Sequence, residues 1–545
     1  MNIKKIQKED ILLIFLMALF FYHQYYAIIF GGTIFDDPGH ISTAKRIIDK
    51  SILFFQDPNN PFLSEFNAFN YEFYGYIVAI PVFIFSNNKY VLTIFENLLQ
   101  NNPNVNINNI EEFGYIVRYN SITVYVAIVL FLIYRLLNNF YSKGNSLLVI
   151  LFLIMTPSFS GQALFNIKDV PFALQLFLAT LYLLFIEKKR MGIKNASLKE
   201  KIFIMLLISS VLLVRLNGIV FIGLVSLYLL ASSKEKINYI FSYFYLYIGS
   251  FILFFLGSPS SWQKPKLYLT EVIKTQFFLE WTGTTLTNGE YIYALNMEPD
   301  YLLTWFFFRL PIVFHISLIV GTIVYFSSHK KSEPFKLSIF YIYVINFVFI
   351  LFLPASYDGI RQYIFLLPFF SIVLLEVITF IRNNLLKKAA LVLVVVYLLF
   401  TQIGLGPYKY VYFNEFTAEE EISIYCDEVG GCGNWATDYL GFSGKELSKK
   451  ILKLDIDEAY ICEPTYAFDT FLDNEVKLLN YASVNELPSN QEFFILNLHR
   501  PMQGYDLCGF VDMNREYSCD LVDLVTTNLR GYEINLSYIQ KCIFT

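Results

Sequence analysis

A succession of long apolar stretches, separated by short charged segments, is the feature that most constrains what this chain can fold into. A helix of about 20 apolar residues crosses the hydrocarbon core of a bilayer. Only 16% of the residues are charged, which excludes a soluble enzyme, a coiled coil and a disordered chain. The sequence therefore predicts a polytopic α-helical membrane protein with about eleven transmembrane helices. The expected spans are Ile11–Phe30, Tyr115–Leu137, Ser146–Phe159, Pro171–Ile186, Ile202–Val214, Ile219–Ala231, Ile240–Leu256, Phe306–Phe326, Leu337–Pro354, Gln362–Ile381 and Ala389–Leu405.

The distribution of lysine and arginine predicts the orientation of these helices. Lysine-rich segments flank residues 202–231 on both sides, and the positive-inside rule places both flanks in the cytoplasm. We therefore interpret this stretch as a short hairpin with Arg215 at its outer tip, and not as one long helix. The N-terminus then lies inside and the C-terminal region outside the cytoplasmic membrane. The two long loops, 31–114 and 257–305, also fall outside, so the function is expected to face the outside.

The C-terminal part differs from the rest in charge. From Leu405 onward the chain has 10 basic and 23 acidic residues, whereas the residues before it have 31 basic and 23 acidic ones. Helical and strand patterns alternate after this point, at 445–454, 458–462 and 492–498. The sequence therefore predicts a membrane domain, 1–404, followed by an extracytoplasmic α/β domain, 405–545.

All six cysteines lie in this acidic part. An even number of cysteines confined to one polar region indicates disulfides in an oxidising compartment. Six cysteines allow about 15 pairings, so the sequence assigns no connectivity, although Cys426/Cys432 and Cys508/Cys519 are close in sequence and are the natural guesses. A zinc site is the alternative, but no CxxC pair occurs and His499 is the only histidine of this part. The cysteines are Cys426, Cys432, Cys462, Cys508, Cys519 and Cys542.

An acidic pair follows the first span at once, in Phe35-Asp36-Asp37-Pro38-Gly39-His40. Two adjacent carboxylates at a membrane surface repel each other, so one of them needs a cation, a donor or an altered pKa. The alternative is helix capping, because an aspartate before a proline often begins a helix. The same two interpretations apply to Lys168-Asp169-Val170-Pro171, at another outer helix start. Asp36, Asp37 and Asp169 could therefore converge on one cavity.

Two arginines stand at outer ends of spans. Arg361 lies in Tyr357-Asp358-Gly359-Ile360-Arg361, and Arg215 lies at the expected hairpin tip. Arginine binds phosphate through two parallel hydrogen bonds, although at a membrane surface it can also simply reach towards water. Glu72, in the first outer loop, could border a substrate groove. The sequence contains no GxGxxG, P-loop or HExxH motif, so nucleotide-driven catalysis is not indicated, and nucleic acid is not an expected partner.

Taken together, these motifs resemble the GT-C membrane glycosyltransferases, and most closely the bacterial branch of protein O-mannosyltransferases and aminoarabinose transferases. The resemblance also rests on the order in which these motifs follow one another. Together they cover nearly the whole membrane-spanning region and the start of the C-terminal part. The motifs that carry it are Phe35–His40, Ala163–Phe172, Leu286–Glu290, Tyr357–Arg361 and Gly406–Glu415.

The resemblance implies a fold, a reaction and residue roles. The enzyme would move a sugar from a polyprenyl-phosphate donor to an acceptor outside the membrane, with inversion at the anomeric carbon. Asp36 and Asp37 would be the catalytic carboxylates, although the family has glutamate at the second position. A divalent cation, Mg²⁺ or Mn²⁺, could bind Asp37 and Asp169, but nothing in the sequence requires a cofactor. The substrate-binding residues would be Arg361, Arg215, Asp169, Lys168, His40, Asp358, Tyr357 and Glu72.

A membrane transporter or lipid flippase is the alternative from another class. It would place charged residues near the bilayer midplane and build the chain from two related halves. Glu376, deep in its span, and the short 202–231 hairpin favour it. The absence of visible halves and the gathering of acidic residues at outer loop starts favour the enzyme.

Overall fold

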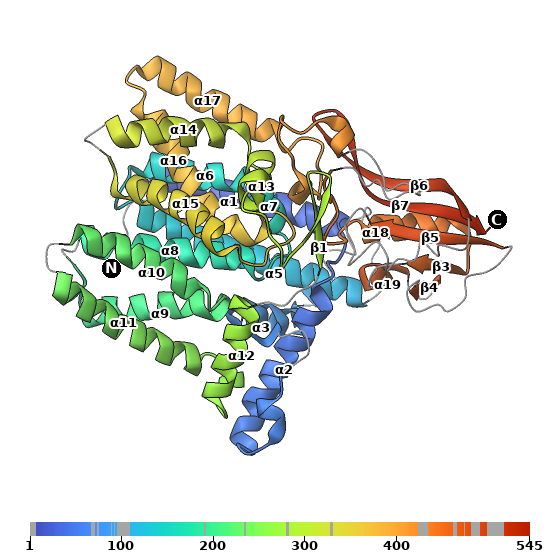
Figure 1. Ribbon diagram of the computed structural model, residues 1–545, viewed down its shortest axis with the longest axis horizontal. Helices are drawn as coiled ribbons and strands as arrows, with labels where there is room; N and C mark the ends of the chain where they lie inside the picture. Colours follow the sequence, from blue (N-terminus) through green and yellow to red (C-terminus); the bar gives the residue numbers. More distant parts are fainter. Residues whose placement is uncertain are drawn as a thin grey trace.

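The computed structural model is a long bundle of helices with a β-sheet at one end (Figure 1). It describes residues 7–544 except for 67–70, 74–75, 89, 92, 95–109, 190–191, 234–235, 279–282, 328–330, 423–433, 462–465, 473–474, 481–490 and 499–516.

Six helical segments among the described residues are long and apolar enough to cross a membrane. The pair α13 and α14, bent by 117° at Pro311, makes a seventh if it is counted as one span. The six are α1 (Lys8–Phe30), α5 (Ile110–Leu137), α8 (Asp169–Lys189), α11 (Lys236–Leu256), α15 (Glu333–Phe352) and the run of η5 (Arg361–Leu366) into α16 (Leu367–Phe380). The protein is therefore a multi-pass membrane protein.

The prediction of about eleven spans is not confirmed, although every expected span falls on helical structure. Several helices are too short to pass on their own, and proline explains two of the breaks. The expected span 146–159 divides at Pro157, and 306–326 divides at Pro311. The segment 202–231 consists of two helices with a break at Arg215, as expected. The shorter helices are α6 (Lys143–Ile154), α7 (Pro157–Gln162), α9 (Leu198–Val214), α10 (Gly218–Ser232), α13 (Tyr301–Arg309), α14 (Ile312–Ser327) and α17 (Asn384–Phe400).

The two long loops form a lobe beside the bundle. Its largest helices are α2 (Asp37–Gln56) and α12 (Pro265–Phe277), which project together from one side (Figure 1). Glu72 joins these parts, because its buried carboxylate binds Arg46 and Lys50 of α2 and accepts a hydrogen bond of 2.9 Å from Ser260. The other elements are η1 (Pro61–Ser64), η2 (Tyr71–Phe73), α3 (Tyr76–Ser86), η3 (Ile193–Asn195), η4 (Pro259–Ser261), β1 (Thr284–Thr287) and β2 (Glu290–Tyr293).

The C-terminal region forms a five-stranded mixed sheet in the order β4-β3-β5-β7-β6. Strands β3, β4 and β5 are parallel to one another. Strand β7 pairs antiparallel with β5 on one side and with β6, its partner in a long hairpin, on the other. The strand and helix patterns predicted at 445–454, 458–462 and 492–498 are confirmed, whereas the hairpin was missed. The elements are η6 (Lys409–Val411), η7 (Glu419–Glu421), α18 (Gly444–Ile451), η8 (Leu452–Leu454), β3 (Glu458–Ile461), α19 (Tyr466–Leu472), β4 (Lys477–Asn480), β5 (Glu492–Leu498), β6 (Tyr517–Leu529) and β7 (Tyr532–Phe544).

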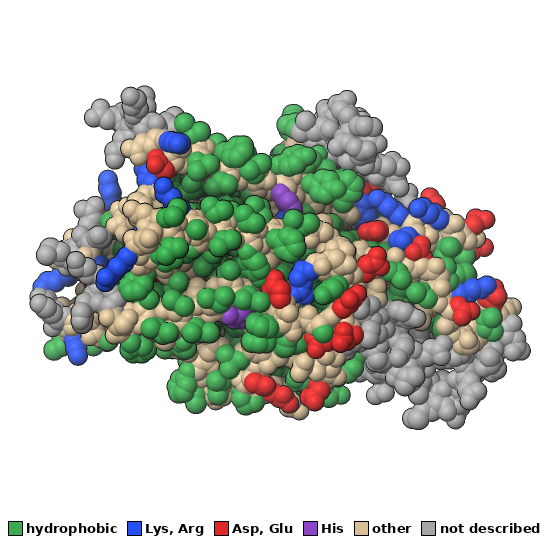
Figure 2. Space-filling model, turned by 90° about the horizontal axis from the view of Figure 1, so that it is seen from above, with side chains coloured by type: hydrophobic (Ala, Val, Ile, Leu, Met, Phe, Trp, Pro, Cys, Tyr) green, Lys and Arg blue, Asp and Glu red, His purple; other side chains and the backbone are tan. Residues whose placement is uncertain are grey.

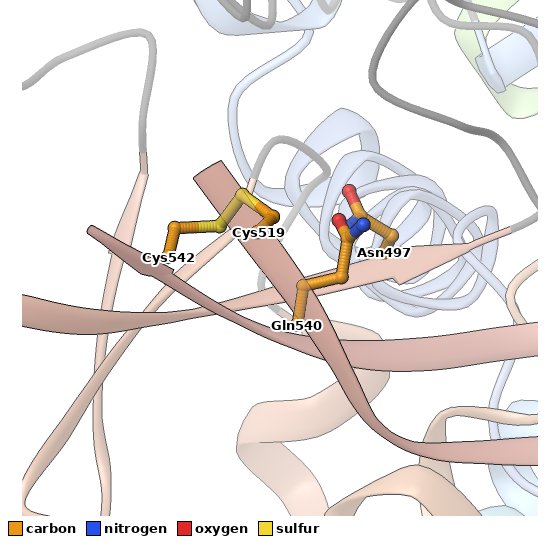
Figure 3. Close-up of a disulfide and its surroundings, with 4 residues drawn as sticks. All are labelled: Asn497, Cys519, Gln540 and Cys542. Carbon is orange, nitrogen blue, oxygen red and sulfur yellow. A yellow bond between two sulfur atoms is a disulfide. The ribbon is translucent and has the colours of Figure 1, made fainter. Parts of the chain in front are cut away.

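A disulfide joins Cys519 and Cys542, which lie opposite each other on β6 and β7 (Figure 3). Cys519 therefore pairs with Cys542, and not with Cys508, the cysteine nearest to it in sequence. Beside the disulfide, Asn497 donates a hydrogen bond of 3.0 Å to Gln540. The other four cysteines, and so the pairing Cys426/Cys432, lie outside the described residues.

Charge is distributed unevenly along the molecule. Figure 2 shows a broad hydrophobic surface over the helices, with lysine and arginine at the end remote from the sheet and again among the acidic side chains on the half that carries the sheet. Aspartate and glutamate gather on the half that carries the sheet. This is the asymmetry on which the predicted orientation depends, and that orientation stays a prediction.

The C-terminal region is fastened to the N-terminal helices by buried polar bonds. Lys445 of α18 lies 2.8 Å from the Glu112 carboxylate and donates to the Ile29 carbonyl at 2.7 Å and to the Tyr115 hydroxyl at 3.0 Å. Both charged side chains are about 5% exposed or less. A buried ion pair whose partners also have neutral hydrogen bonds fixes one arrangement of the parts it joins.

Replacing Lys445 with methionine is expected to lower the free energy of unfolding by about 3–5 kcal/mol, because Glu112 is left buried without its cation. The measurement is the unfolding midpoint of the purified protein in detergent. Lys450→Met is the matched control, because its partner Asp523 is 42% exposed and such pairs contribute at most about 1 kcal/mol. Equal shifts for the two variants would contradict the expectation.

Candidate active site

The loop between α1 and α2 carries the acidic pair and is shaped by the C-terminal region. Gly32 N–H donates to the Phe442 carbonyl at 3.0 Å, and Phe35 N–H donates to the Leu440 carbonyl at 3.2 Å. Glycine is required at position 31, because a Cβ there would meet the Phe442 ring at 2.2 Å. The backbone entering Asp36 is therefore held by a segment some 400 residues away in sequence.

Asp36 faces two cations, Lys168 and Arg361, and the imidazole of His40. Its carboxylate lies 3.3 Å from Lys168 Nζ, 3.8 Å from Arg361 Nη1 and 4.0 Å from His40 Nε2. Asp36 occupies the position that precedes α2, but its side chain makes no capping hydrogen bond. The capping interpretation of the sequence therefore fails for Asp36, and its carboxylate is turned towards the cations.

Asp169 is the second carboxylate of the cluster. It binds Arg215, lies 3.5 Å from Arg361 Nε and accepts a hydrogen bond of 2.9 Å from Asn166 Nδ2. Asn166 is fixed in turn, because its side-chain oxygen accepts the backbone N–H groups of Lys168 and Asp169 at 3.0 and 2.7 Å. The turn before α8 thus holds Asp169 in place through its own backbone.

Arg361 connects the carboxylates to one another. Besides Asp36 and Asp169, its guanidinium lies 3.0 Å from Asp358 Oδ2 and 5.3 Å from the centre of the Tyr357 ring. Only 6% of its side chain is exposed. Asp358 and Gly359 form a turn in which both residues have positive φ, of 57° and 65°, and this turn places the Asp358 carboxylate beside Arg361. This ion cluster, Asp36, Lys168, Asp169, Arg215, Asp358 and Arg361, contains three cations and three carboxylates.

The ion cluster forms the polar end of a cavity of about 1040 Å³. Small-molecule sites are usually roughly 300–1,000 Å³, so this one is at the large end. The other end is apolar, and Phe278 and Phe352 at its margin are more than 70% exposed. Apolar residues of α10, α12 and α15 make its walls, among them Val220, Phe221, Phe277, Ile345, Val348 and Phe349.

Burial alone would raise the pKa of Asp36, but the charges of Lys168 and Arg361 outweigh it and hold that pKa far below its usual range. Burial and the charge of Lys168 lower the pKa of His40 to about 3. Burial also lowers the pKa of Lys168. At neutral pH the site therefore contains an ionised Asp36 beside a neutral imidazole.

These shifts predict the pH dependence of kcat/KM. Asp36 keeps its charge, and the ion pairs that the charge stabilises, until the pH falls through its depressed pKa. His40 stays neutral above about pH 3. We therefore expect no acid limb between about pH 5.5 and 8, and an alkaline limb that begins below the ordinary lysine pKa of about 10.4, because Lys168 loses its charge early. An acid limb near pH 6.5 in initial-rate measurements would show that His40 titrates normally.

The structure separates the residues that the sequence grouped together. Asp36, Lys168, Arg215, Tyr357, Asp358 and Arg361 line the large cavity, and Asp169 lies behind them in the ion cluster. Asp37 and His40 line a separate cavity of about 20 Å³, where Tyr119 donates to Asp37 at 2.5 Å. Glu72 does not line the large cavity but joins the parts of the outer lobe.

A metal site at Asp37 and Asp169 receives no support from this arrangement. Asp37 faces Tyr119 and Arg118, whereas Asp169 faces Asn166 and two arginines. Within the described ranges, no three His, Cys, Asp or Glu side chains lie together where they could hold an ion.

Two cavity residues, Tyr439 and Leu440, were not predicted from the sequence. They belong to the acidic C-terminal part, and nothing in their surroundings marks a motif. Gln162 was also missed, although it is one helical turn before Asn166 and bonds to it at 2.8 Å. A helical reading of the segment before Asn166 would have placed both amides on one face.

Of three comparisons with known proteins, only the comparison with solved structures finds a match. No protein-family model and no curated protein matches the chain. Among solved structures, ArnT from Cupriavidus metallidurans bound to undecaprenyl phosphate shares 10% sequence identity over 97% of each chain, with a TM-score of 0.48. The same protein in its apo state shares 10% identity over 97% of each chain, with a TM-score of 0.33.

Proposed function

We propose that this protein is a membrane glycosyltransferase that moves a sugar from a polyprenyl-phosphate donor to an acceptor outside the cytoplasmic membrane. The observation that carries the proposal is the two-ended cavity. Three cations at one end suit a phosphate, and the apolar channel between α10 and α15 suits the isoprene chain attached to it. A carboxylate, Asp36, stands at the charged end, where the sugar would be placed.

The reaction is a single displacement at the anomeric carbon. An acceptor oxygen forms a bond to that carbon while the bond to the phosphate oxygen breaks. Asp36 takes the proton of the acceptor hydroxyl, and the phosphate leaves with the bonding electrons. Arg361, Arg215 and Lys168 stabilise the charge that develops on the phosphate. Attack from the side opposite the phosphate inverts the anomeric configuration.

Binding of the donor also prepares the base. In the unliganded site Asp36 is a weak base, because Lys168 and Arg361 depress its pKa. A phosphate that engages these two cations shares their charge and allows the pKa of Asp36 to rise. The carboxylate thus becomes a better proton acceptor only when the donor is present.

Asp169 and Asp37 would act as positioning residues. Asp169 orients Arg215 and Arg361, and Asp37 supports the loop that carries Asp36 through its bond to Tyr119. No step of this displacement requires a metal, since the phosphate is an activated leaving group. The N-terminus is placed in the cytoplasm and the sheet outside, as the charge distribution predicts.

The test is transfer of radiolabelled sugar by purified protein in nanodiscs, with a panel of polyprenyl-phosphate sugars and a crude envelope extract as acceptor. Label that moves to an acceptor supports the proposal and identifies the sugar. Binding of polyprenyl phosphate without any transfer, together with movement of the labelled lipid between leaflets, would replace it with the flippase alternative.

A further inference from the structure

We infer that Tyr439, from the C-terminal region, is a ligand-contacting residue whose hydroxyl donates a hydrogen bond to the phosphate bound in the cavity. The inference rests on the proposed function and adds a residue to that site. Tyr439 lines the large cavity, and only 6% of it is exposed.

The direction of the Tyr439 hydroxyl follows from a chain of hydrogen bonds that begins at the backbone. Backbone N–H groups can only donate, so the Asn166 atom that receives two of them, at 3.0 and 2.7 Å, is its oxygen. The Asn166 amide nitrogen therefore faces the other way. It donates to Asp169 at 2.9 Å and to Gln162 Oε1 at 2.8 Å.

The hydrogen bonds of Gln162 determine which atom accepts in its contact with Tyr439. Its side-chain oxygen is used by Asn166, so its amide nitrogen is the atom that lies 2.7 Å from the Tyr439 oxygen. An amide nitrogen donates and does not accept, so the Tyr439 oxygen is the acceptor of this bond. The Tyr439 hydrogen must then point elsewhere, and it has no acceptor among the residues that the structure describes.

The surroundings keep Tyr439 protonated. Burial raises the pKa of its hydroxyl above the ordinary value, and the nearby charges of Arg309, Asp358, Arg361 and Asp169 also act on it. It is therefore a donor at every physiological pH. A buried hydroxyl that lines a cavity without an acceptor costs free energy until a ligand supplies one.

The charge of the site explains why a neutral donor is useful there. The three cations of the ion cluster already face three carboxylates. The phosphate gains one negative charge when the sugar leaves. A phenolic donor can bind this developing charge without a further carboxylate to balance it.

The experiment measures binding of sugar-free polyprenyl phosphate to the full-length protein in nanodiscs. Tyr439→Phe is expected to weaken binding about ten-fold, or about 1.4 kcal/mol, because it removes one hydrogen bond to a charged group. Tyr408→Phe is the matched control, because it removes a buried phenol that bonds Glu446 at 3.0 Å in the same region but does not line the cavity. The control should bind as the wild type does.

A second variant tests the hydrogen-bond chain. In Gln162→Glu the side chain can no longer donate to Tyr439 and instead accepts from it, which turns the Tyr439 hydrogen away from the ligand. We therefore expect Tyr439→Phe to have no further effect on binding in the Gln162→Glu background. A role of Tyr439 in packing alone would leave its effect the same in both backgrounds.

The outcomes separate the two proposals. If the wild type binds polyprenyl phosphate and Tyr439→Phe binds it equally well, Tyr439 does not contact the phosphate and the inference is overturned. A loss that appears only with the sugar-bearing donor would also overturn it, because the contact would then be to the sugar. If the wild type itself does not bind polyprenyl phosphate, the proposed function is what fails.

Discussion

Replacing Asp36 with asparagine is expected to reduce sugar transfer by roughly 10²–10⁴-fold, because the amide cannot take the proton of the acceptor hydroxyl. The variant should fold, since Asp36 makes no capping bond and asparagine has the same shape. It should also bind polyprenyl phosphate at least as tightly as the wild type, because Lys168 and Arg361 lose a competing anion. The measurements are initial rates of transfer and the dissociation constant of the lipid.

Asp49→Asn is the control for this prediction. Asp49 lies on α2, the helix that begins directly after Asp36, and its side chain is exposed. It should transfer sugar at the wild-type rate. Undiminished transfer by Asp36→Asn would remove Asp36 from the role of base and leave Asp358 as the remaining carboxylate among the described residues that line the cavity.

Replacing Arg361 with alanine is expected to weaken binding of polyprenyl phosphate by about 30-fold or more, which corresponds to the roughly 2–5 kcal/mol of a truncated buried charge pair. Arg361 lies within 4 Å of three carboxylates, so its removal leaves them facing the phosphate with two cations in place of three. Repulsion is then added to the lost attraction. Binding should also become less sensitive to salt.

Two further variants serve as controls for the Arg361→Ala result. Arg361→Lys keeps the charge but not the two parallel donors, so it should restore only part of the affinity. Arg382→Ala removes an exposed arginine beyond the end of α16 and should leave binding unchanged. Wild-type affinity in Arg361→Ala would place the phosphate elsewhere in the molecule.

The sequence was informative where a local pattern determines the structure. The position of Asp36 after a first apolar helix, and of Asp169 at a later helix start, follows from helix length and from the proline that begins each following helix. Their meeting in one cluster was predicted because both loops were assigned to the outer side. The break at Arg215 was predicted from the charges that flank its two helices.

The sequence was uninformative where contacts join distant segments. Asp37 and Asp36 are neighbours in sequence, yet they line different cavities, because the helix start turns successive side chains in different directions. Glu72 was expected to border a substrate groove, but its charge is neutralised by Arg46 and Lys50 of α2. These two cations belong to no recognisable sequence motif. Tyr439 reaches the site only because Lys445 and Phe442 attach its segment to the end of α1.

That attachment has a consequence for how the protein is made. Lys445 and its partner Ile29 are 416 residues apart, and the Asp36 loop depends on backbone bonds to the same late segment. At a synthesis rate of roughly 5–20 residues per second, about 20–80 seconds separate the two parts leaving the ribosome. During that interval the first helices are already inserted while the Asp36 loop lacks the partners that shape it. A chain interrupted before residue 440 would carry every residue of the ion cluster and still have an unfinished site.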